Sequence, residues 1–214
     1  MPVLEEMTSF ELRRLIDGGG RVGVVPFGSV EYHGGHLPLG SDALLADAVG
    51  AAVAEQLGAV LAPTFRVGCA DQHMAGAGTL MISMETLCGV VLAMARSLIG
   101  HGFRVIVLVS THGGNQGVLE RAALELSREY RDVVVCAPRG DVGTDAGTHS
   151  GRWLTSVMLS LRPDLVEADL AGEGLKAEVP DATPETGAKN LERFVSTIVQ
   201  QVRGAAQDPP GGAS

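Results

Sequence analysis

Residues 104–115, RVIVLVSTHGGN, combine the clearest strand of this sequence with a turn that carries a histidine. The strand part, 104–110, is a largely apolar run bounded by turn residues. Residues 21–27 (RVGVVPF) form a second such run, and a histidine-bearing loop follows it as well. Segments with helical spacing come next in each case, at 42–57 and 115–128. Strands too apolar to face water predict an α/β fold, with a mainly parallel sheet flanked by helices.

The remaining periodic segments extend this alternation of helix and strand. Further strands are expected at 59–63 and 133–137, and further helices at 8–18, 85–99, 153–161 and 188–202. At 214 residues the chain is long enough for one sizeable core. We therefore predict a single domain over residues 1–204, followed by a flexible tail over residues 205–214.

The composition excludes several classes of function. A formal net charge of -9 and the lack of a basic stripe argue against a nucleic-acid partner. The three cysteines are widely spaced and form no CxxC pair, so neither a disulfide framework nor a zinc knuckle is expected. The first residues lack the basic and apolar regions of a signal peptide, and no apolar run approaches the roughly 18 residues of a membrane span. We expect a cytoplasmic protein without a membrane partner.

The loop after residues 21–27 concentrates groups that bind metals. Residues 31–42 (EYHGGHLPLGSD) hold two carboxylates and two imidazoles, and their glycines and proline prevent a regular helix. Sites in open α/β sheets form beyond the carboxyl ends of the strands. The side chains expected to meet there are Glu31, His33, Asp42 and His112. Convergent carboxylates and imidazoles suit a divalent metal, so the residues suggest a metal-dependent hydrolase.

The histidines are unevenly distributed along the chain. His101 has a structural explanation, as a cation at the C-terminus of a helix. The other five lie in glycine-rich connections: His33, His36, His73, His112 and His149. A single loop histidine is more often solvated or structural than a ligand. Several loop histidines at one edge of a sheet favour a functional site there.

Four segments of the chain occur in an order that suggests a family. They are residues 28–42 (GSVEYHGGHLPLGSD), Gly78-Thr79 after His73, residues 112–115 (HGGN) and residues 149–156 (HSGRWLTS). Together they resemble the motifs of the creatininase family of metal-dependent amide hydrolases, and the resemblance extends from about residue 5 to residue 200.

The resemblance implies a three-layer α/β sandwich with one or two divalent ions, either zinc, manganese or iron. Asp42 would bridge two ions, Glu31 and His112 would complete the ligands of one, and His33 would bind the other. A metal-bound water would be the nucleophile. His149, with Glu31, would be catalytic, passing a proton to the departing nitrogen. The resemblance also implies a homo-oligomer, typically a hexamer.

The substrate would be a small-molecule or short-peptide amide. The expected substrate-binding residues are His73, Gly78, Thr79, Arg152 and Trp153. Arg152 can grip a carboxylate bidentately; alternatively, it is a surface arginine at a helix start, beside a core tryptophan. Family reactions include creatinine ring opening, deformylation of a formamidopyrimidine and cleavage of the mycofactocin precursor peptide. Residues 136–138 (CAP) and Arg152 look most like the mycofactocin branch.

One departure from the family pattern concerns the second ion. The family has E-T-S where this chain has Leu154-Thr155-Ser156, and leucine cannot coordinate a metal. Three explanations remain open: a one-metal enzyme, a replacement ligand, or reduced catalysis. The nearby candidates for a replacement are Asp71, Asp141 and Asp145.

Two hypotheses about function follow from these residues. The first is a metal-dependent hydrolase of a non-standard linear or cyclic amide, acting in specialised-metabolite or cofactor biosynthesis. The second is a catalytically reduced creatininase-like paralogue that binds a small molecule or acts as a scaffold.

Overall fold

Four parallel strands form the central layer of the computed structural model, which describes residues 1–143, 148–172 and 179–207. The strands are β1 (Val22–Phe27), β2 (Val60–Leu61), β3 (Val105–Ser110) and β4 (Val134–Cys136). Their order in the sheet is β2-β1-β3-β4, and every neighbouring pair is parallel. The two strands that the sequence marks most strongly therefore lie side by side at the centre.

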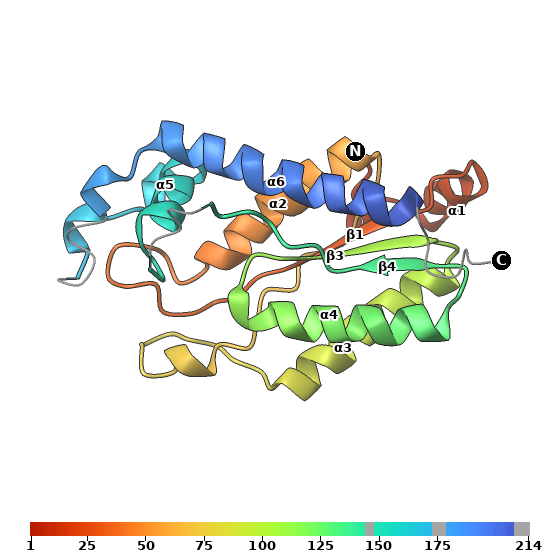
Figure 1. Ribbon diagram of the computed structural model, residues 1–214, viewed down its shortest axis with the longest axis horizontal. Coiled ribbons are helices and arrows are strands. Elements are labelled where there is room, and N and C mark those ends of the chain that lie inside the picture. Colours follow the sequence, from red (N-terminus) through yellow and green to blue (C-terminus); the bar gives the residue numbers. More distant parts are fainter. Residues whose placement is uncertain (144–147, 173–178, 208–214) are drawn as a thin grey trace.

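Helices cover both faces of the sheet (Figure 1). The α-helices are α1 (Ser9–Asp17), α2 (Ser41–Leu57), α3 (Met84–Gly100), α4 (Gly113–Glu129), α5 (Arg152–Leu161) and α6 (Pro184–Gln207). Short 3-10 helices lie at Leu4–Glu6, Asp71–His73, Pro163–Leu165, Ala168–Leu170 and Val179–Asp181. The predicted three-layer α/β sandwich is confirmed.

Two apolar cores lie on opposite faces of the sheet because successive side chains of a strand point to opposite sides. Phe27 and Leu108 belong to the core beneath α3 and α4. Val24 and Val107 belong to the core beneath α2, α5 and α6. All four side chains are fully buried. This two-sided burial explains why the strands are apolar without alternation.

The ends of the elements differ from the sequence prediction in a few places. β2 has two residues rather than five, and α6 begins at Pro184 and ends at Gln207. Residues 205–207 are therefore helical, which corrects the start of the predicted tail. Residues 208–214 lie outside the described residues. Among those that are described, no helix has the length and apolar character needed to cross a membrane.

We predict that the contact between α5 and α6 depends on Gly187. A Cβ placed at Gly187 would lie 1.9 Å from the carbonyl oxygen of Ser156 in α5, whereas one at Gly204 of the same helix meets nothing within 4 Å. We expect Gly187→Ala to lower the free energy of unfolding by about 1–3 kcal/mol, as overpacking does. Gly204→Ala, the matched control, should be neutral or raise it by up to about 1 kcal/mol. Urea denaturation of both variants measures the difference; equal stabilities would contradict the prediction.

Candidate active site

The carboxyl ends of β1 and β3 open into a cavity of about 260 Å³ that contains the predicted metal ligands. Glu31 and His33 come from the loop after β1, Asp42 from the first turn of α2, and His112 from the residue before α4. None of the four residues is more than 5% exposed. The structure thus brings together all four side chains that the sequence predicted to meet.

Each carboxylate directs one oxygen toward His112 and the other toward His33. His112 Nδ1 lies 3.1 Å from Glu31 Oε2 and 3.1 Å from Asp42 Oδ2. His33 Nε2 lies 3.4 Å from Asp42 Oδ1 and 3.9 Å from Glu31 Oε1. We call the first set the His112 group (Glu31, Asp42, His112) and the second the His33 group (Glu31, Asp42, His33). The two carboxylates are shared between the groups.

Backbone carbonyls set the orientation of both imidazoles. His33 Nδ1 lies 3.0 Å from the carbonyl oxygen of Glu31, and His112 Nε2 lies 3.0 Å from that of Cys69. A carbonyl oxygen only accepts, so each of these nitrogens carries a hydrogen. The opposite nitrogens, His33 Nε2 and His112 Nδ1, face the carboxylates. A hydrogen bond from the second nitrogen of a histidine to a carbonyl is the usual arrangement around a bound metal.

The charges of the cluster favour a cation between its members. Burial opposes protonation of His33 and His112, but hydrogen bonding and attraction from Asp42, with the charge of Glu31, outweigh it and raise the pKa of both imidazoles. Burial also opposes ionisation of Asp42, yet its hydrogen bonds with His112 and His33 lower the pKa of the carboxyl. Ionised carboxylates facing nitrogens need a positive charge between them, either a proton or a metal ion.

The donor atoms fit a divalent metal. The His112 group is one set of side chains whose ligand atoms all lie within 4.8 Å of one another, and Glu31, His33 and His149 form another. Bonds of about 2.0–2.1 Å in a tetrahedral zinc site place neighbouring donors about 3.3–3.4 Å apart, close to the separations within the His112 group. Within the described residues, neither oxygen of Glu31 accepts a hydrogen bond, although both are buried. A bound cation would satisfy them.

Three imidazoles stack at the mouth of this cluster. The ring of His149 lies between His33, with centroids 4.8 Å apart, and His73, with centroids 4.0 Å apart. His149 Nε2 is 3.0 Å from the carbonyl oxygen of Tyr32 and 3.9 Å from Glu31 Oε1. His73 Nε2 is 3.5 Å from the same oxygen of Glu31. Burial and the neighbouring His149 lower the pKa of His73. The structure therefore places His73 beside the candidate ligands.

Residues that the sequence analysis did not select hold the cluster in place. Asn115 is fully buried; its side-chain amide donates to the carbonyl of Gly28 (2.9 Å) and accepts from the amide of Cys69 (3.0 Å). A Cβ at Gly114 would lie 2.2 Å from the Cys69 carbonyl oxygen, the acceptor of His112. Thr111 donates from its hydroxyl to the carbonyl of Asp42 at 2.7 Å. Thr111, Gly114 and Asn115 all lie in residues 111–115, so their position beside His112 in the sequence was the one indication of these supporting roles.

His36 supports the loop that carries His149. Its Nε2 lies 3.1 Å from the carbonyl oxygen of Ser150 and 3.1 Å from the hydroxyl of Thr155. Burial lowers the pKa of His36. Ser150 has a φ of 61°, and it is the only non-glycine residue with positive φ in the described ranges. Backbone strain of this kind persists where surrounding contacts enforce it.

Three of the expected substrate-binding residues, Gly78, Thr79 and Arg152, do not line this cavity. The hydroxyl of Thr79 donates to the carbonyl of His73 at 2.9 Å and accepts from the amide of Tyr32 at 3.0 Å. Gly78 has a φ of 90°, and a Cβ there would lie 2.3 Å from Leu39. Both residues therefore shape the loop that carries His73, while the residues that line the cavity come from other segments.

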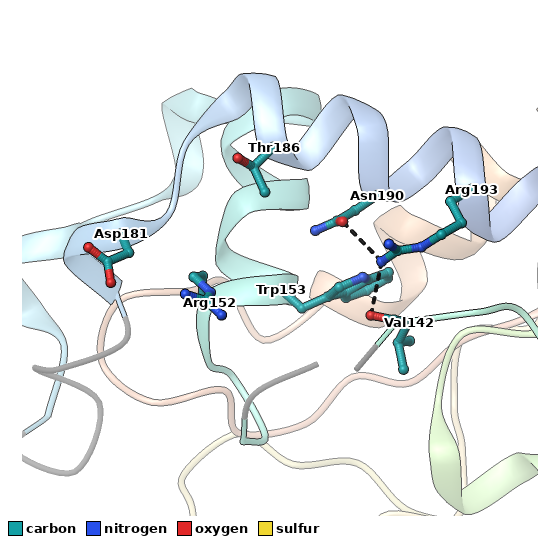
Figure 2. Close-up of a pocket in the computed structure, with 8 residues that line it drawn as sticks. Val142, Arg152, Trp153, Asp181, Thr186, Asn190 and Arg193 are labelled. Carbon is teal, nitrogen blue, oxygen red and sulfur yellow. Dashed lines mark hydrogen bonds between the residues drawn. The ribbon is translucent and has the colours of Figure 1, made fainter. Parts of the chain in front are cut away.

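Arg152 and Trp153 line a neighbouring cavity of about 300 Å³, which Figure 2 shows beside the N-terminus of α5. Arg193 donates there to the carbonyl of Val142 at 3.1 Å and to the side-chain oxygen of Asn190 at 3.2 Å. Trp153 and Val142 also line the first cavity, so the two are adjacent. Both interpretations of Arg152 remain compatible with this position.

Leu154 lines the first cavity, at the position where the family pattern has a carboxylate. The proposed replacements lie elsewhere. Asp71 is exposed on the surface of its 3-10 helix, and Asp141 accepts from the amide of Gly143 at 2.7 Å while facing Arg193 at 3.6 Å. Asp145 falls outside the described residues.

Comparisons with known proteins agree with this geometry. The mycofactocin precursor peptide peptidase of Mycobacterium ulcerans (strain Agy99) is 37% identical over 170 residues, which are 75% of this chain and 66% of the relative. A solved creatininase with manganese superposes with a TM-score of 0.82 at 27% identity, covering 97% of this chain and 99% of that one. A mutant creatininase of the Zn–Zn type superposes with a TM-score of 0.80 at 27% identity, covering 97% and 98%.

The comparison with protein families gives a match that covers most of the chain. A family model described as creatininase, creatinine amidohydrolase, matches residues 5–201. This range contains both carboxylates and all five loop histidines. From this match and the identity to its relatives, the chain belongs to the creatininase family of hydrolases.

Proposed function

We propose that this protein hydrolyses an amide C–N bond with the help of divalent metal held by Glu31, His33, Asp42 and His112. One observation carries the proposal: two buried carboxylates share their oxygens between two imidazoles whose other nitrogens are bound to backbone carbonyls. Burying such charges without a cation is costly, so the arrangement is difficult to explain as a scaffold alone. Creatininase structures with manganese and with zinc support a divalent ion.

The residues around the metal have separate tasks in this proposal. A bound divalent ion lowers the pKa of water and polarises a carbonyl. His149 lies at the mouth of the cavity with 41% of its side chain exposed, and its Nε2–H is held by the carbonyl of Tyr32. We propose that His149 delivers a proton from Nε2 to the departing nitrogen. Glu31 Oε1 lies 3.9 Å from the same nitrogen.

We propose a short peptide, rather than a cyclic small molecule, as the substrate class. Two relatives named as peptide peptidases share 37% and 34% identity with this chain, compared with 32% for a relative named creatinine amidohydrolase. The cavity of Arg152 and Trp153 adjoins the metal-type cavity and offers room for the part of a substrate beyond the amide. A role in cofactor or specialised-metabolite biosynthesis is consistent with this class.

The scaffold hypothesis retains one specific observation in its favour, the apolar Leu154 within the cavity. Loss of a carboxylate from this position reduces the donors available to the His33 group. The two hypotheses make opposite predictions for the effect of replacing Asp42. This carboxylate belongs to both groups, whereas a scaffold would not need it.

We predict that Asp42→Asn abolishes metal binding at both groups and strongly reduces turnover. Mutating partners that only support a ligand already costs roughly 10–100-fold in affinity or activity, so a shared ligand should cost at least as much. Asp47→Asn is the matched control, because Asp47 lies on the same helix and forms an exposed ion pair with Arg66. Metal content is measured by plasma mass spectrometry, and turnover on creatinine and short synthetic peptides.

If the metal-loaded wild type hydrolyses none of these amides and Asp42→Asn leaves the cellular phenotype unchanged, the scaffold hypothesis is preferred. Circular dichroism of each variant verifies that the fold is retained.

We predict a different result for His149→Gln. Removing the proton donor should lower turnover by roughly 10²–10⁴-fold, the usual contribution of general acid–base catalysis. Metal content should remain that of the wild type, because His149 Nε2 is engaged by the Tyr32 carbonyl. Loss of metal together with turnover would contradict the assignment of His149 as a proton donor.

We also expect the chain to form a homo-oligomer, as the family resemblance implies. Several large apolar side chains are exposed around the loop of His73 and the start of α3, namely Met74, Leu80, Met81 and Met84. Apolar patches of this kind often mark interfaces between proteins. Light scattering after size exclusion should give a mass several times the 22.2 kDa of one chain. A mass of one chain at micromolar concentration would contradict this prediction.

A further inference from the structure

The imidazole of His149, which serves as the proton donor in the proposed function, is the most exposed of the four in the active-site cavity. Its side chain is 41% exposed, compared with 18% for His73, 4% for His112 and 0% for His33. A hydrogen bond from Nε2 to the Tyr32 carbonyl, at 3.0 Å, fixes one atom of the ring. One such bond does not define the plane of the ring, so other contacts have to do so.

The inner face of the His149 ring lies against a neighbour that is itself fixed. His33 is fully buried, and its Nδ1 is bonded to the carbonyl of Glu31 at 3.0 Å. The rings of His33 and His149 have centroids 4.8 Å apart and planes inclined by 22°. This side of His149 is therefore closed.

The ring of His73 covers the other face of His149, and this contact is the closer of the two. The centroids are 4.0 Å apart and the planes are inclined by 16°. His149 thus stands between two nearly parallel rings, with the partly exposed His73 on the outside. Packing of this kind locks the orientation of a functional side chain.

The loop that carries His73 is bonded to the same residue that binds His149. The hydroxyl of Thr79 donates to the carbonyl of His73 at 2.9 Å and accepts from the amide of Tyr32 at 3.0 Å. The carbonyl of Tyr32 is in turn the acceptor for His149 Nε2. Gly76 lies in this loop, and a Cβ there would lie 2.2 Å from the Cβ of Tyr32. His73, Thr79 and Tyr32 therefore form one frame around the proton donor.

We propose that His73 is a positioning residue for His149. The face of its ring holds the plane of the His149 imidazole, so that His149 Nε2 stays in the cavity, 3.9 Å from Glu31 Oε1. His73 acts through His149 and does not need to touch the substrate. This inference rests on the proposed amide hydrolysis with His149 as the proton donor.

The nitrogens of His73 are not what this role requires. Its Nε2 lies at the edge of the ring, 3.3 Å from the side-chain nitrogen of Gln72 and 3.5 Å from Glu31 Oε1, whereas the face of the ring contacts His149. His73 also belongs to neither set of convergent metal donors among the described residues. A flat ring without nitrogens should therefore replace it, while an apolar side chain without a ring should not.

Steady-state kinetics of the metal-loaded protein test the proposal, with whichever of creatinine and the short synthetic peptides the wild type hydrolyses fastest. We expect His73→Ala and His73→Leu to lower kcat by about 10–100-fold with little change in KM, because a misplacement of about 1 Å can cost roughly 100-fold in rate. His73→Phe should recover most of the lost kcat. His101→Ala, at an exposed histidine after α3, is the matched control and should behave as the wild type.

Two kinetic results would overturn the proposal. A raised KM with unchanged kcat in His73→Ala would make His73 a substrate-binding residue instead. A kcat for His73→Phe as low as that for His73→Ala would show that the nitrogens of His73 matter rather than its stacked face. Metal content, measured by plasma mass spectrometry, should equal that of the wild type in every variant.

Chemical modification tests the position of His149 without an assay of activity. Diethyl pyrocarbonate modifies accessible imidazoles, and peptide mass spectrometry gives the rate at each histidine. Loss of the covering ring should make His149 react several-fold faster in His73→Ala and His73→Leu than in the wild type and His73→Phe. The exposed His101 should react at the same rate in all four proteins, which provides an internal reference.

Equal rates of modification at His149 in all four proteins would overturn the positioning role while leaving the hydrolase proposal in place. If the metal-loaded wild type hydrolyses none of the amides, the proposed function fails. The modification rate at His149 then still decides whether His73 holds this ring.

Discussion

Two carboxylates buried side by side are the constraint on which the rest of this site depends. Glu31 and Asp42 are at most 5% exposed, and each faces imidazoles with both oxygens. Charges of the same sign cannot be buried together unless positive charge lies between them. The imidazoles of His33 and His112 supply it when protonated, and a divalent cation supplies it more effectively. A cation bound between Glu31 and Asp42 would therefore also offset the electrostatic cost of burying the two carboxylates.

The parallel sheet brings the side chains of the site together. Because β1 and β3 are adjacent and parallel, the loops that follow them open at the same edge. Asn115 then joins the loop after β1 to the segment of Cys69, whose carbonyl orients His112. The absence of a side chain at Gly114 permits this close approach. The orientation of a single imidazole thus depends on the packing of several segments.

Leu154 stands where the family pattern has a carboxylate, but the two carboxylates and two imidazoles of the site still meet. An imidazole from a different loop lies beside the unpartnered oxygen of Glu31, and neither Asp71 nor Asp141 does. The leucine removes one negative charge relative to the family pattern from a cluster that holds two carboxylates. Relatives named for peptide and for creatinine hydrolysis show that this framework accommodates different amides.

The sequence alone determined the α/β class, the positions of the main strands and helices, and the meeting of Glu31, His33, Asp42 and His112. These features follow from apolar periodicity and from the rule that parallel strands present their loops at one edge. Tertiary structure decided which nitrogen of each histidine faces the carboxylates, because the acceptor for His112 is a carbonyl 43 residues away. It also decided that His73 lies beside Glu31 and that Gly78 and Thr79 do not line the cavity. Contacts between segments distant along the chain depend on how the whole fold packs. The apolar periodicity of a short segment does not predict them.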